Sequence, residues 1–393
     1  MRVPTNRAVT RSSRSQTDTS AQNPPATTQQ RAQPQTLERT LEALEQREKP
    51  AKATRPVRLF DVSGYRFITH TRPDGQPVHI EIHGSLVIPH MLLPGGAELP
   101  PLILPGKTLN FLALGDGGHG TDNQRKTAMA LTKMAKERGV NFGVYTGDII
   151  YPHGISGPND PQLKEKFVDM YKGLPEMHAV PGNHDYGSVT GAGIPEALVE
   201  AANRNTEGMF RMPTRYYSRL VKVDGLTIRT LFLDTATLAV DPVQLSWIHK
   251  QLAKDADYTL VFGHHPVENI GWHGSSDILK ALLLPLLEAR ADLYVCGHEH
   301  NQQQLRTKGG LPTIVSGAAS ESMPTMKIGR SEFASIRRGG GFFTVGREGI
   351  KYEALSSSKE AVMFTNTFQK RERTELPKLS LPSGLGLEDD KSA

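Results

Sequence analysis

The chain has 393 residues, of which 37% are hydrophobic and 22% are charged, and this is enough for one large folded domain or two ordinary ones. No run of about 18 apolar residues is present, so no membrane-spanning helix is expected. The net charge of +5 resides entirely in residues 1–57, and a nucleic-acid-binding face is therefore not indicated for the folded body.

Residues 1–57 are rich in Ser, Thr, Gln, Pro and Arg, and we expect them to form a disordered basic tail because they contain few side chains that could build a core. No apolar segment follows the first residues, so no ordinary secretory signal peptide is indicated. This predicts a cytoplasmic protein, with export by a leaderless route as the alternative. The single cysteine, Cys296, excludes an intrachain disulfide.

Residues 58–107 are predicted to form a β-rich lead-in. Polar and apolar residues alternate over 65–68 and 78–82, and Pro73-Asp74-Gly75 between them is a typical turn. We expect a hairpin or an edge element here. The Pro-rich stretch 99–106 is interpreted as a break before the next domain.

From residue 110 onward, predicted strands and helices alternate, which is typical of an α/β fold. The strands are expected at 110–114, 141–145, 177–180, 226–233, 258–262 and 292–295, and the helices at 121–138, 161–172, 243–254 and 277–289. Two late strands, at 313–316 and 341–345, are expected to return antiparallel. The prediction is a layered sandwich of mixed β-sheets flanked by helices over residues 108–365, followed by a loose polar tail at 366–393.

Five segments share one pattern, in which an apolar strand ends in glycine or a tight turn and a metal-binding type of side chain follows. The polar residues at these strand ends are Asp116, Asp148, Asn183-His184-Asp185, His264-His265 and His298-Glu299-His300. Taken alone, a Gly-Asp segment is more typical of a turn or a helix cap, and His-Glu-His is only a weak indication of a metal site. Together they indicate a shared site, because side chains at the carboxyl ends of neighbouring strands converge on one crevice. We therefore predict a centre that binds two metal ions.

The set resembles the calcineurin-like metallophosphoesterases and, within them, the purple acid phosphatases of the tartrate-resistant type. The distinguishing residue is Tyr151, three positions after Asp148. The resemblance covers roughly residues 108–350 and includes segments 233–238, 244–248, 264–267, 297–301 and 315–318.

The resemblance implies two metal positions that share Asp148. The first would be held by Asp116, Asp148, Tyr151 and His300, and the second by Asp148, Asn183, His264 and His298. A phenolate with carboxylates suits Fe(III), whereas the amide oxygen and two imidazoles suit a divalent Fe, Zn or Mn ion. Asp185 is expected to be structural, and we interpret it as an acceptor that orients a ligand histidine.

The implied activity is that of an acid-phosphatase-like phosphomonoesterase acting on a phosphorylated small molecule or protein. A metal-bound hydroxide would attack phosphorus in line. His184 would serve as general acid or phosphate contact, and His273 as a second histidine facing the substrate.

Two departures from the family pattern bear on the site: Ile149 stands where the family usually has Asn, and His265 where the small acid phosphatases usually have Tyr. His119 lies close enough in sequence to the first ligand segment to reach the pocket. Three alternatives remain open: a phosphodiesterase acting on nucleotides or phospholipids, an exported effector that dephosphorylates a protein, and an inactive scaffold used for binding. The last alternative predicts missing ligands, and none is missing.

Overall fold

The computed structural model describes residues 60–62, 65–71, 77–83, 86–91, 95–187, 195–204 and 209–379. The predicted disordered tail at 1–57 and the end of the predicted C-terminal tail, from residue 380 onward, lie outside the described residues. Within the described part, no helix combines the length and the apolar character needed to cross a bilayer.

The β-rich lead-in forms an antiparallel four-stranded sheet in the order β1-β2-β3-β4. Its strands are β1 (Phe60–Val62), β2 (Tyr65–Thr71), β3 (Pro77–His83) and β4 (Leu86–Met91). The predicted hairpin corresponds to the β2–β3 pair, in which Ile68 lies opposite Ile80.

An eight-stranded sheet has the order β16-β14-β15-β13-β12-β11-β10-β5. The strands are β5 (Ala97–Leu104), β10 (Tyr217–Val223), β11 (Leu226–Phe232), β12 (Tyr258–Phe262), β13 (Leu293–Cys296), β14 (Gln302–Arg306), β15 (Pro312–Ser316) and β16 (Ser331–Ser335). The interpretation of 99–106 as a break is wrong, because most of this stretch lies in β5. Pro100 and Pro101 are tolerated there because β5 is the last strand of the sheet.

A seven-stranded sheet has the order β19-β18-β17-β6-β7-β8-β9. Its strands are β6 (Leu109–Leu114), β7 (Phe142–Tyr145), β8 (Met177–Ala179), β9 (Phe210–Arg211), β17 (Gly339–Gly346), β18 (Gly349–Ser356) and β19 (Ala361–Phe368). β17 pairs antiparallel with β6, as predicted. β15 was also predicted to be antiparallel, and this is correct for only one of its two neighbours. It pairs antiparallel with β14 but parallel with β13.

The two large sheets share one core. Phe111 of β6 stacks on Phe343 of β17, with ring centroids 4.6 Å apart, and its edge meets Phe262 of β12 at 5.6 Å. β6 and β7 are almost entirely buried, which explains why their sequences are continuous apolar runs rather than alternating ones.

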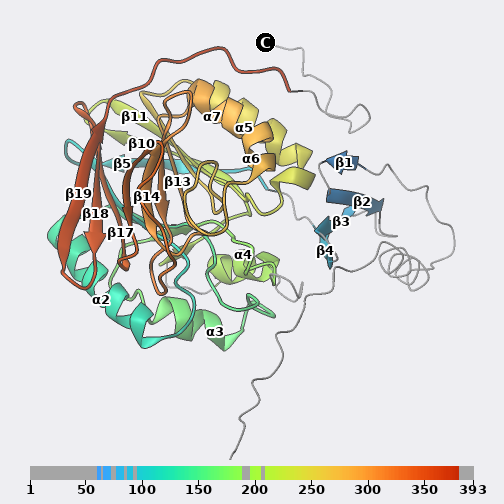
Figure 1. The fold of residues 1–393 in the computed structure, drawn as a ribbon, viewed down its shortest axis with the longest axis horizontal. Helices are drawn as coiled ribbons and strands as arrows, with labels where there is room; N and C mark the ends of the chain where they lie inside the picture. The colour runs from blue at the N-terminus through green and yellow to red at the C-terminus, as the bar shows by residue number, and fades with distance from the viewer. Residues whose placement is uncertain are drawn as a thin grey trace, which may run out of the picture. The chain divides into compact units, whose positions relative to one another are not determined.

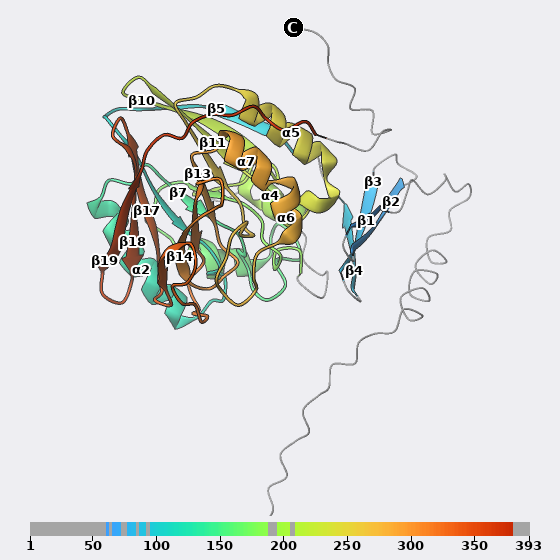
Figure 2. The same ribbon diagram turned by 45° about the horizontal axis from the view of Figure 1, so that its top comes forward.

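Helices cover the outer faces of this pair of sheets. Figures 1 and 2 show α5 (Pro242–Ala253), α6 (Asp277–Leu282) and α7 (Leu284–Arg290) together on one side, and α2 (Asp122–Glu137) on the other. The remaining helices are α3 (Pro161–Leu163), which continues as a π-helical turn over Lys164–Val168, and α4 (Pro195–Arg204). The predicted α/β layered fold is confirmed.

Two predicted helices differ from the observed ones. The helix expected at 277–289 is divided into α6 and α7, because Pro285 in the first turn of α7 has no backbone N–H for a continuous helix. The helix expected at 161–172 ends near residue 168. By contrast, α2 begins as its sequence predicts, with the Thr121 side chain accepting a hydrogen bond from the Gln124 N–H.

Residues 366–379 are not the loose tail that was expected. β19 continues to Phe368, and the backbone N–H of Arg371 then donates to Asp292 Oδ1 at 2.9 Å. Arg373 Nη2 donates to the other oxygen of the same carboxylate at 2.7 Å. Leu376 and Leu379 pack against the apolar cluster that also includes α5 and α7. The segment is therefore anchored over this outer face.

Candidate metal centre

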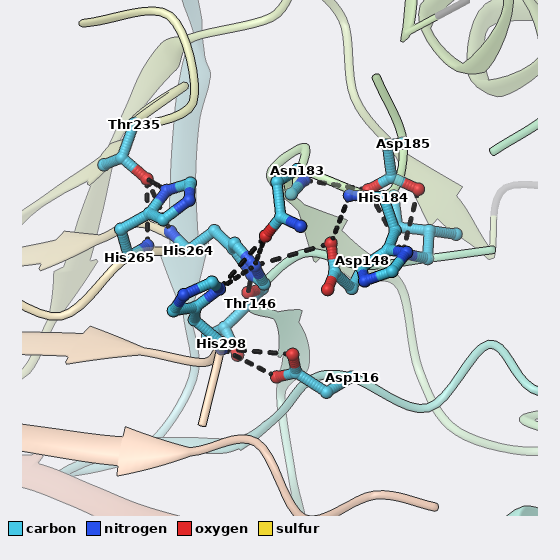
Figure 3. Close-up of polar contacts among 12 residues, drawn as sticks. Asp116, Thr146, Asp148, Asn183, His184, Asp185, Thr235, His264, His265 and His298 are labelled. Carbon is cyan, nitrogen blue, oxygen red and sulfur yellow. Dashed lines mark hydrogen bonds and ion pairs between the residues drawn. The ribbon is translucent and has the colours of Figure 1, made fainter. Parts of the chain in front are cut away.

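The predicted ligands lie at the carboxyl ends of strands from both large sheets. Asp116 follows β6, Asp148 follows β7 and Asn183 follows β8, all in the seven-stranded sheet. His264 follows β12 and His298 follows β13, in the eight-stranded sheet. Figure 3 shows that these side chains point toward one another, so five segments far apart in sequence converge as predicted.

Three of these residues have a backbone conformation that ordinary residues avoid. The φ angles of Asp116, Asp148 and His298 are 60°, 53° and 69°. Such left-handed conformations are unfavourable for residues with a Cβ and tend to occur at functional sites, where surrounding contacts maintain them. Here the His298 N–H donates to both Asp116 oxygens at 3.1 and 3.0 Å, and so links the two sheets.

Glycines beside the ligands leave space for the carboxylates of the site. A Cβ at Gly182 would collide with Asp148 Oδ1, and a Cβ at Gly297 would collide with Asp116 Oδ2. Any side chain at either position would displace a carboxylate from the site.

Three predicted ligands surround the hydroxyl of Tyr151, which is itself the fourth. This hydroxyl lies 2.7 Å from Asp148 Oδ2, 3.2 Å from Asp116 Oδ1 and 2.9 Å from His300 Nε2. These are the four residues that the resemblance assigns to the first metal.

A second group of donors surrounds the amide oxygen of Asn183. Asn183 Oδ1 lies 3.0 Å from His264 Nε2 and 3.0 Å from His298 Nδ1, and the two ring nitrogens are 3.3 Å apart. The other carboxylate oxygen of Asp148, Oδ1, lies 3.4 Å from His264 Nε2. The two oxygens of Asp148 therefore face different donor groups, as a bridging ligand requires.

The electrostatics of these groups are those of a cation site. Asp116 and Asp148 are 0% and 1% exposed. Burial and the charge of Asp148 raise the pKa of Asp116 well above its ordinary value, and burial together with both carboxylates raises the pKa of the Tyr151 phenol.

Burial lowers the pKa values of His264 and His298, which favours the neutral, ligating form of both rings. Cations would stabilise the anions and neutral imidazoles together. The donor sets thus fit two metals, a harder ion among the oxygens and a borderline divalent ion among the nitrogens.

The two predicted substrate-facing histidines flank these groups. The ring of His184 lies 4.2 Å from that of Tyr151, and its Nδ1 is 2.7 Å from Pro152 O. The ring of His273 lies 4.6 Å from that of His298. A hydrogen bond with Glu299 raises the pKa of His273 above its ordinary value.

The interpretation of Asp185 as an acceptor for a ligand histidine is wrong. Its carboxylate accepts instead from the backbone N–H groups of Ile149, Ile150 and Gly182, at 2.8 to 3.2 Å. Burial and the charge of Asp148 raise its pKa to about 8. Asp185 thus joins the Asp148 and Asn183 loops through main-chain groups, for which the sequence contains no recognisable signal.

His119 does reach the pocket, and sequence reasoning missed the partner that holds it there. Its ring stacks on Tyr151 with centroids 3.8 Å apart and an interplanar angle of 19°. Ser320 Oγ lies 2.6 Å from His119 Nδ1 and donates to Asp116 O at 3.0 Å. The contact joins segments about two hundred residues apart, which no local pattern reveals.

Glu299, between the two predicted ligand histidines, also went unassigned. Its carboxylate accepts from Asn269 Nδ2 at 2.6 Å, from the Trp272 N–H at 3.0 Å and from the His273 N–H at 2.5 Å. The loop containing His273 is therefore anchored on the segment that contains the ligands.

Comparisons with known proteins agree with this geometry. Residues 109–302 match the family model described as calcineurin-like phosphoesterase. The chain is 30% identical over 288 residues to tartrate-resistant acid phosphatase type 5 of Sus scrofa, with 65% of this chain and 81% of that protein covered. It is 31% identical over 250 residues to purple acid phosphatase 4 of Arabidopsis thaliana, with 56% and 70% covered.

Among solved structures, that of GAP50 from Plasmodium is similar to this chain. It is described as the anchor in the inner membrane complex. The TM-score is 0.62 at 26% identity, and the match covers 70% of this chain and 98% of that one. The sequence relationship, the fold and the ligand geometry lead to the same conclusion: the chain belongs to the purple and tartrate-resistant acid phosphatases of the calcineurin-like phosphoesterase family, whose members are hydrolases.

Proposed function

We propose that this protein is a phosphomonoesterase with two metal ions, an Fe(III) and a divalent Fe, Zn or Mn ion. The first position would use Asp116, Asp148, Tyr151 and His300, and the second Asp148, Asn183, His264 and His298. The observation that supports this most directly is the orientation of Asp148, whose two oxygens contact separate donor groups. When bound, two such cations neutralise a phosphate ester and acidify water.

The protein's own contribution begins with fixing its ligand atoms. His264 Nδ1 lies 2.8 Å from Thr146 O, and since a carbonyl only accepts, the ring donates from Nδ1. Its Nε2 lone pair therefore faces Asn183 and Asp148, as a ligand must. The backbone N–H of His184 donates to Asp148 Oδ1 at 2.9 Å and so holds the shared carboxylate in place.

His184 and His273 are the proposed proton donors or phosphate contacts. The contact of His184 Nδ1 with a carbonyl means that Nε2 donates only in the imidazolium form, which is the form a general acid needs. His273 lies beside the negative charge of Glu299, with Nδ1 3.4 Å from Oε1, and this pairing also favours an imidazolium.

Two other functions, those of a phosphodiesterase and of a binding scaffold, can be distinguished from this one by experiment. A phosphodiesterase would use the same metals, and a scaffold role is suggested by the name of GAP50. The presence of all seven predicted ligands favours an enzyme over a scaffold. Action on a phosphorylated protein, a cytoplasmic location and leaderless export stay predictions, because the tail on which the last two depend lies outside the described residues.

The test is to count metals and to compare hydrolysis of aryl phosphate monoesters and diesters across pH with the same preparation. We expect about two metals per chain and faster hydrolysis of the monoester. Faster hydrolysis of the diester would assign the alternative activity. A protein that takes up no Fe, Zn or Mn would contradict the proposal.

A further inference from the structure

His265 and Thr235 form an unusual contact beside the second donor group. The hydroxyl oxygen of Thr235 lies 3.1 Å from the backbone N of His264, 3.0 Å from the backbone N of His265 and 3.0 Å from His265 Nδ1. Figure 3 shows all three contacts meeting at one oxygen atom.

The capacity of a hydroxyl group determines how these contacts are used. A hydroxyl has one proton and two lone pairs, and backbone N–H groups can only donate. The N–H groups of His264 and His265 therefore occupy both lone pairs of Thr235. The remaining contact uses the hydroxyl proton, so His265 Nδ1 accepts it, and the neutral ring must hold its own proton on Nε2.

His265 lies close enough to the site for this proton to matter. Its ring centroid is 4.7 Å from that of His298 and 4.8 Å from that of His264. Nitrogens of the three rings lie within 4.8 Å of one another, a cluster that could itself hold a metal ion. A ligating nitrogen needs a free lone pair, however, and in neutral His265 the lone pair of Nδ1 is engaged by Thr235.

Two adjacent histidines thus receive opposite assignments from their neighbours. His264 donates from Nδ1 to a carbonyl and directs a lone pair at the site, whereas His265 accepts at Nδ1 and has an N–H at Nε2. We propose that His265 is not a metal ligand but a phosphate contact, donating from Nε2 to an oxygen of the bound phosphoryl group. This rests on the proposed function and adds a substrate contact to it.

The assignment also distinguishes His265 from His184. His184 donates from Nε2 only as an imidazolium, whereas His265 donates while neutral.

The test replaces His265 with Phe, which retains a ring but has no donor, in the full-length protein loaded with metal. Metals per chain are measured by mass spectrometry, and binding of inorganic phosphate by calorimetry. We expect both metals to remain and phosphate affinity to fall on the order of tenfold to a hundredfold, as for one hydrogen bond to a charged acceptor. His265→Gln keeps a side-chain N–H and should recover part of the loss.

His249→Phe is the matched control. This histidine lies on α5 and contacts Pro377 O at 3.2 Å, so its loss should leave phosphate binding unchanged. If His265→Phe does not fold, judged by circular dichroism, His265→Leu replaces it.

Loss of a metal from a folded His265 variant would overturn the proposal, because it would identify a ligand. Wild-type phosphate affinity in that variant would also overturn it. A wild-type protein that binds metals and phosphate but hydrolyses no ester would contradict the proposed function and leave the phosphate contact standing.

Discussion

The two large sheets supply chemically different halves of the same site. The strand ends of the seven-stranded sheet provide Asp116, Asp148, Tyr151 and Asn183, all of which offer oxygen. Those of the eight-stranded sheet provide His264, His298 and His300, all of which offer nitrogen. The two halves meet through several contacts, and Asp148 is the residue proposed for both metal positions.

The halves also differ in how they are held without metal. In the oxygen half, burial and then the charge of Asp148 raise the pKa of Asp116. In the nitrogen half, burial lowers the pKa values of the histidines, and the two rings of His264 and His265 are oriented by fixed neighbours. The nitrogen donors are thus neutral and oriented without metal, whereas the oxygen donors hold buried charge that cations would offset.

The largest effect is expected from Asp148→Ala, because both proposed metal positions lose their shared oxygen ligand. Hydrolysis of an aryl phosphate should fall on the order of a thousandfold or more, and fewer than two metals per chain should remain. Steady-state rates and metal analysis test this together. Normal metal content with normal activity would show that Asp148 is not shared by the two metal positions.

A second prediction concerns the metal-free protein. Asp116→Asn should raise its free energy of unfolding at pH 8 on the order of 2 kcal/mol, because a buried charge beside Asp148 is removed. The pKa of Asp116 in the folded protein lies above its ordinary value. The metal-free wild type should therefore lose stability as pH rises from the ordinary pKa of an aspartate toward the raised pKa of the folded state.

Urea unfolding after treatment with chelator measures both effects. His264→Gln, the matched change in the nitrogen half, should produce no such stabilisation. Equal stabilisation by the two substitutions would remove the distinction between the halves.

A smaller effect is expected where the sheets are joined away from the metals. Glu176, just before β8, pairs with Arg211 of β9 at 2.7 Å and with Arg219 of β10 at 2.9 Å. Burial raises its pKa, but hydrogen bonds from His178 and Arg211 outweigh burial and lower it to about 2. His178 is buried and its own pKa is lowered, so the arginines provide the charge.

Because the folded pKa of Glu176 is below its ordinary value, its contribution is present above about pH 4.5 and is lost as pH falls toward 2. Glu176→Gln should remove on the order of 1 kcal/mol at pH 6 and flatten the acid limb of the stability curve. Denaturant unfolding between pH 2 and 6 tests this. An acid limb as steep as in the wild type would show that Glu176 does not contribute to it.

The smallest effect on rate is expected from Tyr151→Phe, which removes one oxygen donor from the proposed iron position only. The iron-loaded wild type should be purple or pink, and the variant should retain iron, lose the colour and change in rate by less than about tenfold. Visible spectra with iron analysis test this. Colour that survives the substitution would exclude Tyr151 as the iron ligand.

The strands that precede the proposed metal ligands were predictable from the sequence. Apolar runs followed by Gly and a polar residue predicted β6, β7, β8, β12 and β13 to within two residues, and they placed the ligand types at the correct ends. Sequence reasoning missed β10, β14, β16, β18 and β19, whose side chains include many polar residues, because their pairing depends on neighbouring strands rather than on a local pattern.

By itself, the sequence determined which residues could bind metals and in what chain order, because ligand chemistry and strand periodicity are local properties. Only the tertiary structure decided how these residues are held. Asp185 contacts main-chain groups, His119 stacks on Tyr151 beside a distant serine, and Thr235 assigns the proton of His265. These contacts depend on which strands pair and how the sheets pack, which brings distant segments within hydrogen-bond distance and is not encoded in any single segment.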